Sequence, residues 1–119
     1  MDNKEFSRKL EQRTKSFAIS IIRLSVLLPG SIEGKIIRNQ LTKAGTSIGA
    51  NYREANRARS KADFRNKIKI CESEANEVCY WLEVIEELEW AETNKLKSVF
   101  LESNEFLAIF TSINKNLKL

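Results

Sequence analysis

Histidine is absent from this chain of 119 residues, and its absence excludes several kinds of catalytic site. Ser-His-Asp and Cys-His nucleophiles need an imidazole, as do the Glu-x-x-His ligands of di-iron helical bundles. Cys71 and Cys79 are eight residues apart, which is not a metal-ligand spacing. No glycine-rich phosphate loop is present either. We expect no catalysis, no cofactor and no metal. The alternative kept open is a metal enzyme that uses the glutamates between residues 72 and 89.

Proline and glycine are scarce, with one proline and four glycines in a chain that is 42% hydrophobic. This composition excludes a disordered tail and a loop-rich β protein. No apolar run approaches the roughly 20 residues that span a bilayer, so we expect no membrane association. The charged start MDNKEFSRKLEQR has no apolar region beside it and is not a secretion signal. A cytoplasmic, reducing location with two free thiols is the resulting expectation.

Charge is divided unevenly along the chain, although the net charge is only +4. Residues 1–71 hold 16 Lys and Arg against 6 Asp and Glu, whereas residues 72–105 hold 2 against 10. Such a division indicates either a polyanionic partner or complementary contact between subunits. The alternative is that neighbouring helices neutralise one another within a monomer.

Helical periodicity dominates the sequence. Apolar residues recur every three or four positions from Phe6 to Leu28, from Ile37 to Ala55, from Phe64 to Ile85 and from Leu96 to Leu117. Pro29-Gly30 is expected to stop the first helix, and Ser31 and Thr93 are the expected N-caps of the second and fourth. The pattern predicts one all-α domain, residues 1–119, folded as an antiparallel up-down-up-down four-helix bundle.

The stretch SIGANYREANRARSKADF, residues 47–64, connects two of these helices without glycine or proline at the connection. Ala55 and Phe64 are nine positions apart, so an unbroken helix would point them to opposite sides. A break near residues 58–60 lets both face one core. Ser60 and Asp63 form a pattern like a capping box, which starts the next helix.

Some apolar surface is left over on the third helix. Ile70, Trp81, Val84 and Leu88 lie on one flank of its core stripe. Aromatic anchors and large exposed apolar patches are typical of interfaces, so this flank is a candidate subunit interface. The alternative is a wide core face with Trp81 at the edge of the bundle.

A basic cluster surrounds the predicted turn. Such clusters contact phosphates, and few aromatics are interleaved here for stacking on bases, so we expect binding through charge or shape. The alternative is a solvated polar end that maintains solubility. The candidate nucleic-acid-binding residues are Arg53, Arg57, Arg59, Lys61, Arg65 and Lys69.

Asn51 lies close to the predicted core stripe of the second helix. It is either a polar residue at the wet end of the bundle or a buried group that bonds a neighbouring helix and fixes register. Glu54, one turn on, has Arg53, Arg57 or a residue across the turn as expected partners.

Several short motifs along residues 40–82 resemble a family of four-helix-bundle proteins. That family was first noticed as reading frames in intervening sequences of bacterial 23S ribosomal RNA genes. The flanking helices fit it in length and pattern. The matching motifs are Gln40-Leu41-x-x-Ala44-x-x-Ser47-Ile48, Asn51-x-x-Glu54, Ser60-x-x-Asp63-Phe64, Glu74-Ala75-x-Glu77 and Tyr80-Trp81-Leu82.

The resemblance implies a homopentameric ring of bundles with a basic surface and no enzymatic activity. It also implies kinship with accessory proteins of diversity-generating retroelements, which bind nucleic acid and a reverse transcriptase. Our first hypothesis is a non-catalytic ring that binds RNA or DNA through this surface. The rival hypothesis is an interaction scaffold that recognises an acidic protein partner without any nucleic-acid role.

Overall fold

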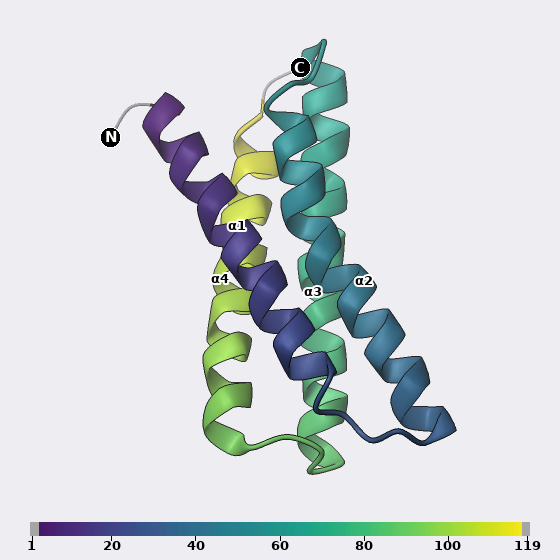
Figure 1. Cartoon of the computed structure of the whole chain (residues 1–119). Coiled ribbons are helices and arrows are strands. Elements are labelled where there is room, and N and C mark those ends of the chain that lie inside the picture. The colour runs from purple at the N-terminus through teal and green to yellow at the C-terminus, as the bar shows by residue number, and fades with distance from the viewer. Residues whose placement is uncertain (1–2, 118–119) are drawn as a thin grey trace.

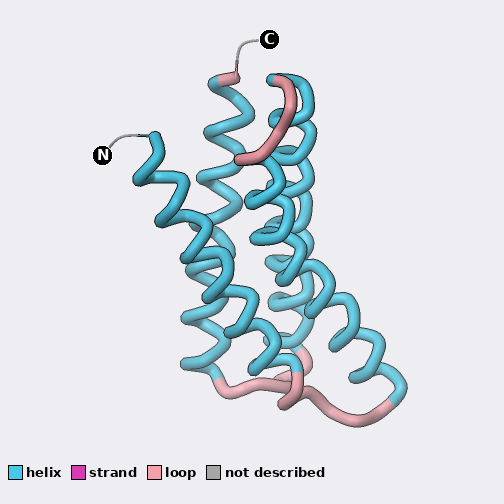
Figure 2. The backbone as a smooth tube through the Cα atoms, turned by 45° about the horizontal axis from the view of Figure 1, so that its top comes forward, coloured by secondary structure: helices cyan, strands magenta, loops and turns pink. Residues whose placement is uncertain are grey.

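The structure, a computed structural model, describes residues 3–117. These residues form four helices: α1 (Asn3–Ser25), α2 (Ile32–Ala55), α3 (Lys61–Glu87) and α4 (Thr93–Asn116). In Figure 1 the chain runs along the molecule four times, and Figure 2 shows short loops joining successive helices. The α2–α3 loop lies at one end, and the α1–α2 and α3–α4 loops lie at the other. The predicted all-α, four-helix fold is confirmed. The predicted domain, 1–119, extends at both ends outside the described residues.

The core is built from one apolar stripe on each helix, because residues three or four apart share a helix face. On α3 the predicted stripe is confirmed, and its residues from Ile68 to Ile85 are fully buried. Aromatic rings from the other three helices belong to the same buried cluster. Phe17 packs edge-on against Phe106 with centroids 5.1 Å apart, and Tyr52 lies 5.7 Å from Phe110.

The predicted break between α2 and α3 is confirmed. Helix α2 ends at Ala55, and Ser60 caps α3 by accepting a hydrogen bond from the backbone N–H of Asp63 at 3.0 Å. Asp63 in turn accepts from the backbone N–H of Arg59 at 3.4 Å. The Ser60 side chain thus satisfies a backbone donor at the start of the helix that has no partner within it, and the Asp63 carboxylate satisfies a donor just before the helix.

Two predicted helix ends differ from the structure. The N-cap of α4 is Glu92 rather than Thr93, since the Glu92 carboxylate accepts from the backbone N–H of Asn94. Helix α1 ends at Ser25, three residues before Leu28, although Leu28 is buried in the following loop. The Ser31 cap of α2 is confirmed by its bond from the Gly34 N–H.

Glycines bring α1 and α2 close together. A Cβ atom built on Gly45 would lie 2.6–2.9 Å from three side-chain carbons of Ile21. One on Gly49 would lie 3.1–3.3 Å from Thr14. Both glycines therefore serve close helix packing.

The predicted core also needs corrections. Tyr52, which the predicted stripe of α2 left out, is 2% exposed, whereas Asn51 is only half-buried. Phe6, the first residue of the predicted α1 stripe, is exposed. On α4 the buried set also includes Val99 and Ser103.

Candidate nucleic-acid interface

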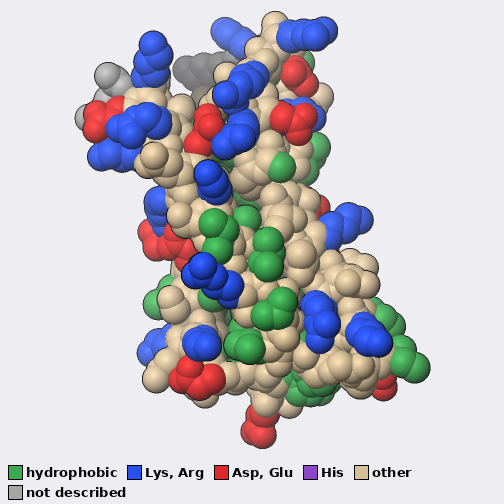
Figure 3. Space-filling model, in the orientation of Figure 1, with side chains coloured by type: hydrophobic (Ala, Val, Ile, Leu, Met, Phe, Trp, Pro, Cys, Tyr) green, Lys and Arg blue, Asp and Glu red, His purple; other side chains and the backbone are tan. Residues whose placement is uncertain are grey.

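Basic side chains from α1, from the end of α2 and from the loop that follows it gather where α1 lies against α2. We define the α1–α2 basic face as Lys4, Arg8, Lys15, Arg53 and Arg57, all of them exposed. Figure 3 shows Lys and Arg side chains gathered over the upper part of this side of the molecule. The α2–α3 loop lies at the same end as the start of α1, and this brings the residues together.

A glutamate organises the centre of this face. Glu11 accepts a hydrogen bond from Asn56 at 2.8 Å and pairs with the Nε of Arg53 at 3.6 Å. Arg57 donates from its guanidinium to the backbone carbonyl of Arg53 at 3.3 Å. The Arg53 side chain is 59% exposed, so its pairing with Glu11 leaves much of the guanidinium open to solvent.

Two open hollows follow the α1–α2 seam on either side of Glu11. One has a volume of about 560 Å³ and is lined by Lys4 and Arg8 of α1 together with Asn56. The other, of about 430 Å³, is lined by Lys15 and Arg53. A shallow seam with cations along its edges suits an extended polyanion better than a compact ligand.

The structure divides the predicted cluster between two sides of the molecule. Arg53 is tied to Glu11 of α1, so it faces the α1 side. Arg65 lies two turns before Glu72, whose carboxylate accepts from Thr111 and Asn114 of α4. Because seven residues bring a helix back to nearly the same side, Arg65 lies toward α4. Lys61 and Lys69 belong to the same row of α3.

The cations of this α3 row and of the loop are available to a ligand. Arg59, Lys61 and Lys69 are exposed, and none forms an ion pair with any residue from 3 to 117. By contrast, Lys67 is held by Glu54 across the turn at 3.4 Å. That pair confirms one of the partners expected for Glu54.

Sequence reasoning missed the contribution of α1. Lys4, Arg8 and Lys15 follow each other at spacings of four and seven, so they share one side of a helix. That signal was present in the sequence. Its meaning depended on the fold, which alone places the start of α1 beside the α2–α3 loop.

Asn51 does not bond a neighbouring helix. Its amide donates to the carbonyl of Ser47, one turn back on α2, at 2.8 Å. The prediction of a register-fixing group is therefore wrong, and the alternative of a polar residue at the edge of the bundle holds.

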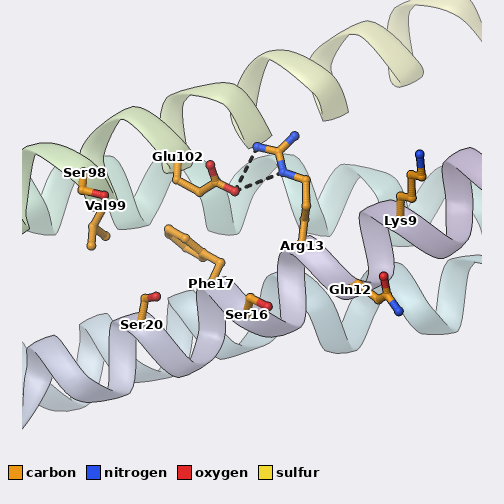
Figure 4. A pocket seen from close by; sticks show the side chains of 9 residues that line it. All are labelled: Lys9, Gln12, Arg13, Ser16, Phe17, Ser20, Ser98, Val99 and Glu102. Carbon is orange, nitrogen blue, oxygen red and sulfur yellow. Dashed lines mark hydrogen bonds and ion pairs between the residues drawn. The ribbon is translucent and has the colours of Figure 1, made fainter.

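A third hollow, of about 480 Å³, lies between α1 and α4 (Figure 4). Arg13 crosses it and donates two hydrogen bonds to Glu102, at 2.9 and 3.1 Å. The same guanidinium lies over the ring of Phe106, 5.0 Å from the centroid. This cation already has its partners, so the hollow offers a poor site for an anion.

The predicted interface flank on α3 is partly covered. Trp81 packs against the core and donates its indole N–H to Glu77 at 3.2 Å. Val84 is half-buried, whereas Ile70 and Leu88 are 39% and 46% exposed. The flank therefore combines a core edge at Trp81 with apolar surface that this chain leaves uncovered.

Burial raises the pKa of two further groups, Cys71 and Glu74. Desolvation raises the pKa of Cys71 to about 12, and its thiol donates to the carbonyl of Ile48. Burial also raises the pKa of Glu74, and the neighbouring charge of Glu77 adds to the effect while Lys43 opposes it. Across residues 3–117, no group of three or more His, Cys, Asp or Glu side chains is placed to hold a metal ion. Within the same range, no helix is long and apolar enough to cross a membrane.

Comparison with known proteins identifies the family of this chain and a similar solved structure. A family model described as 23S rRNA-intervening sequence protein matches residues 7–112. The chain belongs to this family. Among solved structures it is similar to a protein of Bacteroides thetaiotaomicron VPI-5482, described as having unknown function and as coming from the S23 ribosomal protein family. The two share 35% sequence identity with a TM-score of 0.83, over 92% of this chain and 98% of the other. No curated protein matches the chain.

Several residues of the motifs that resemble intervening-sequence proteins make contacts that stabilise the fold of this chain. Ser60 and Asp63 cap α3, and Glu54 forms an ion pair with Lys67 across the turn between α2 and α3. Glu77 holds the indole of Trp81. Since these contacts are architectural, the exposed cations around them are the better candidates for function.

Proposed function

We propose that this intervening-sequence protein is a non-catalytic, homo-oligomeric ring of antiparallel four-helix bundles that binds RNA or DNA through the α1–α2 basic face. The observation that carries the proposal is that four exposed cations, Lys4, Arg8, Lys15 and Arg53, line two hollows that share Glu11, while Arg57 of the α2–α3 loop is bonded to the backbone of Arg53. Lysine and arginine of this kind contact phosphate oxygens and release counterions from the nucleic acid.

The chemistry of the face favours phosphates over bases. Apart from Glu11, which lines both, its two hollows are lined by basic, small and amide side chains, and no aromatic ring lines either of them. Stacking on bases needs such rings, and base reading in a groove needs a protruding helix or strand. Binding is therefore expected to depend strongly on salt and weakly on sequence.

Assembly into a ring would strengthen a weak contact. Each copy carries the same face, and linked sites gain from effective concentration because the second contact forms within one complex. Light scattering of the purified protein at working concentrations tests this part directly. A strict monomer would remove the ring from the proposal.

A polarisation titration with labelled single-stranded RNA, duplex RNA and duplex DNA tests the nucleic-acid part. We expect binding at low salt, with affinity that falls linearly in a log–log plot against salt. Arg8→Glu with Arg57→Glu should weaken binding and lower the salt slope by about 2 on duplex DNA, since each phosphate contact contributes about 0.9.

The matched control is Lys95→Glu with Lys97→Glu, which changes the net charge equally at the start of α4, outside the α1–α2 basic face. It should retain most of the affinity. Equal loss in both variants would indicate attraction by net charge alone. No binding of any probe at low salt would refute the nucleic-acid role and leave the acidic-partner alternative.

A further inference from the structure

Exposed apolar side chains gather on two separate surfaces of the molecule. The first, the α1 patch, consists of Ile19, Ile22 and Val26, which are 42%, 44% and 64% exposed. Their spacing of three and four residues puts them on one side of the chain, while Ile21 and Leu24 point into the core. Figure 3 shows hydrophobic side chains gathered at mid-height on this side of the molecule.

The second surface, the α2–α3 patch, consists of Ile32, Ile36, Trp81, Val84 and Leu88. Its two isoleucines are 76% and 55% exposed, and both were missed when α3 was considered alone.

The register of α2 against α3 places these residues at similar heights along the molecule. Cys71 is bonded to Ile48 and Lys67 to Glu54, so the two helices run in opposite directions, with six residues back along α2 set against four residues forward along α3 between these pairs. Counted from the Cys71–Ile48 pair, Ile36 lies at about the height of Glu83 and Val84, and Ile32 at about the height of Glu87 and Leu88.

The two patches face different directions. Helices α1 and α3 each pack against α2 but not against each other. The α1 patch lies on the side of α1 away from its core stripe, and the α2–α3 patch lies along the outer side of the other two helices. A molecule with two unlike surfaces of this kind can associate head to tail, and head-to-tail contacts close into rings when the rotation permits.

The charges around the patches are opposite. Helix α1 carries six Lys and Arg against Glu5 and Glu11, and Lys15 and Arg23 flank its patch. From Glu72 to Leu88, α3 carries six glutamates and no cation. Pairing two copies through the same patch would oppose like charges, which costs free energy, whereas pairing unlike patches sets cations against carboxylates.

We propose that the α1 patch of one copy docks on the α2–α3 patch of the next, and that this head-to-tail contact builds the ring. The proposal rests on the homo-oligomeric state of the proposed function and identifies its two surfaces. Trp81, with the Tyr80 ring 5.0 Å away, provides the aromatic anchor, and the cations of α1 set the orientation.

Two variants and their mixture test the proposal. The α1-patch variant is Ile22→Glu with Val26→Glu, and the α2–α3-patch variant is Ile36→Gln with Leu88→Gln. All four side chains are at least 44% exposed, so both variants should fold, as circular dichroism would verify. Leu101→Gln is the control, since this side chain is 60% exposed on α4 outside both patches.

Sedimentation should show a ring for the wild type and for the control, and a monomer for each variant alone. An equimolar mixture of the two variants should form a heterodimer and nothing larger, because it restores one intact contact and leaves both ends blocked. If either variant fails to fold, Ile22→Gln and Ile36→Gln provide the same comparison.

The other outcomes separate the two proposals. Folded variants that keep the wild-type mass, or a mixture that stays monomeric, would overturn the docking surfaces while the ring stands. Loss of assembly in the α2–α3-patch variant alone would mean that this patch pairs with itself. A monomeric wild type would overturn the ring and the docking together.

Discussion

Gly45 shows at the scale of one residue why α1 and α2 need a residue without a side chain. We expect Gly45→Ala to lower the free energy of unfolding by about 1–3 kcal/mol, because its Cβ would overlap Ile21 in a packed interface. Gly30→Ala is the control, since nothing lies within 4 Å of its added Cβ and its φ is not positive. Urea unfolding measures both. Equal stability of the two variants would show that α1 can shift away at no cost.

The reactivity of the Cys71 thiol is a second property that can be predicted for a single residue. With a pKa of about 12 and a buried thiol, it should not react with a thiol reagent at pH 8 until the protein opens. Cys79 is buried as well, so two equivalents should appear only in denaturant. Ser112→Cys, at an exposed position on α4, provides the reactive control. One fast equivalent in the native wild type would contradict the buried positions.

The same thiol gives stability a pH dependence. The folded state holds the proton more tightly than the unfolded state, whose thiol pKa is near 9.0. The free energy of unfolding should therefore fall as pH rises from about 9 toward 12. In Cys71→Ala this part of the decline should be absent, and unfolding curves across that range measure the difference.

Asn51 and Tyr52 show where residue-level prediction fails. A stripe drawn through purely apolar residues skips tyrosine, yet the ring of Tyr52 is 2% exposed and packs on Phe110. Tyrosine has a large apolar body that gains from burial while its hydroxyl needs a polar contact. Periodicity places either neighbour near the core, and only the packing of α4 decides between them.

At the scale of a single helix, the N-cap Ser60 stabilises the start of α3. Ser60→Ala removes the acceptor for the Asp63 N–H and should destabilise the protein by about 1 kcal/mol. Ser112→Ala, on the exposed side of α4, should change stability much less. Thermal unfolding of both variants tests this. A neutral Ser60→Ala would mean that water replaces the cap at no cost.

The helices themselves were predictable, and their ends were less so. Phase alone placed the break between Ala55 and Phe64, because one unbroken helix would have exposed one of its two apolar stripes. Thr93 is not the cap because an N-cap residue itself has extended backbone angles, and Glu92 has them, whereas Thr93 is already the first residue of α4. Sequence shows which residues are able to cap, and the loop geometry selects among them.

At the scale of the whole molecule, the candidate site could be predicted only in part. The basic turn was visible in the sequence, but its division between two sides was not, and neither was the addition of Lys4, Arg8 and Lys15. For the same reason, the sequence did not predict that Ile32 and Ile36 of α2 lie at about the height of Leu88 at the end of α3. Each of these pairings joins segments far apart in the chain, so it depends on helix register, which periodicity within one helix does not report.

Salt should separate the two activities proposed for the assembled molecule. Contacts of the α1–α2 basic face with phosphates weaken as salt rises, because counterions released into a more concentrated salt solution gain less entropy. The contact between the α1 patch and the α2–α3 patch includes apolar side chains such as Ile22 and Ile36, whose burial is not screened. At 1 M salt, where the Debye length is about 3 Å, we expect nucleic acid to be released while the ring persists. Sedimentation with absorbance at two wavelengths follows both species in one sample. Dissociation of the ring over the same salt range as the nucleic acid would show that charge, and not the apolar patches, holds the copies together.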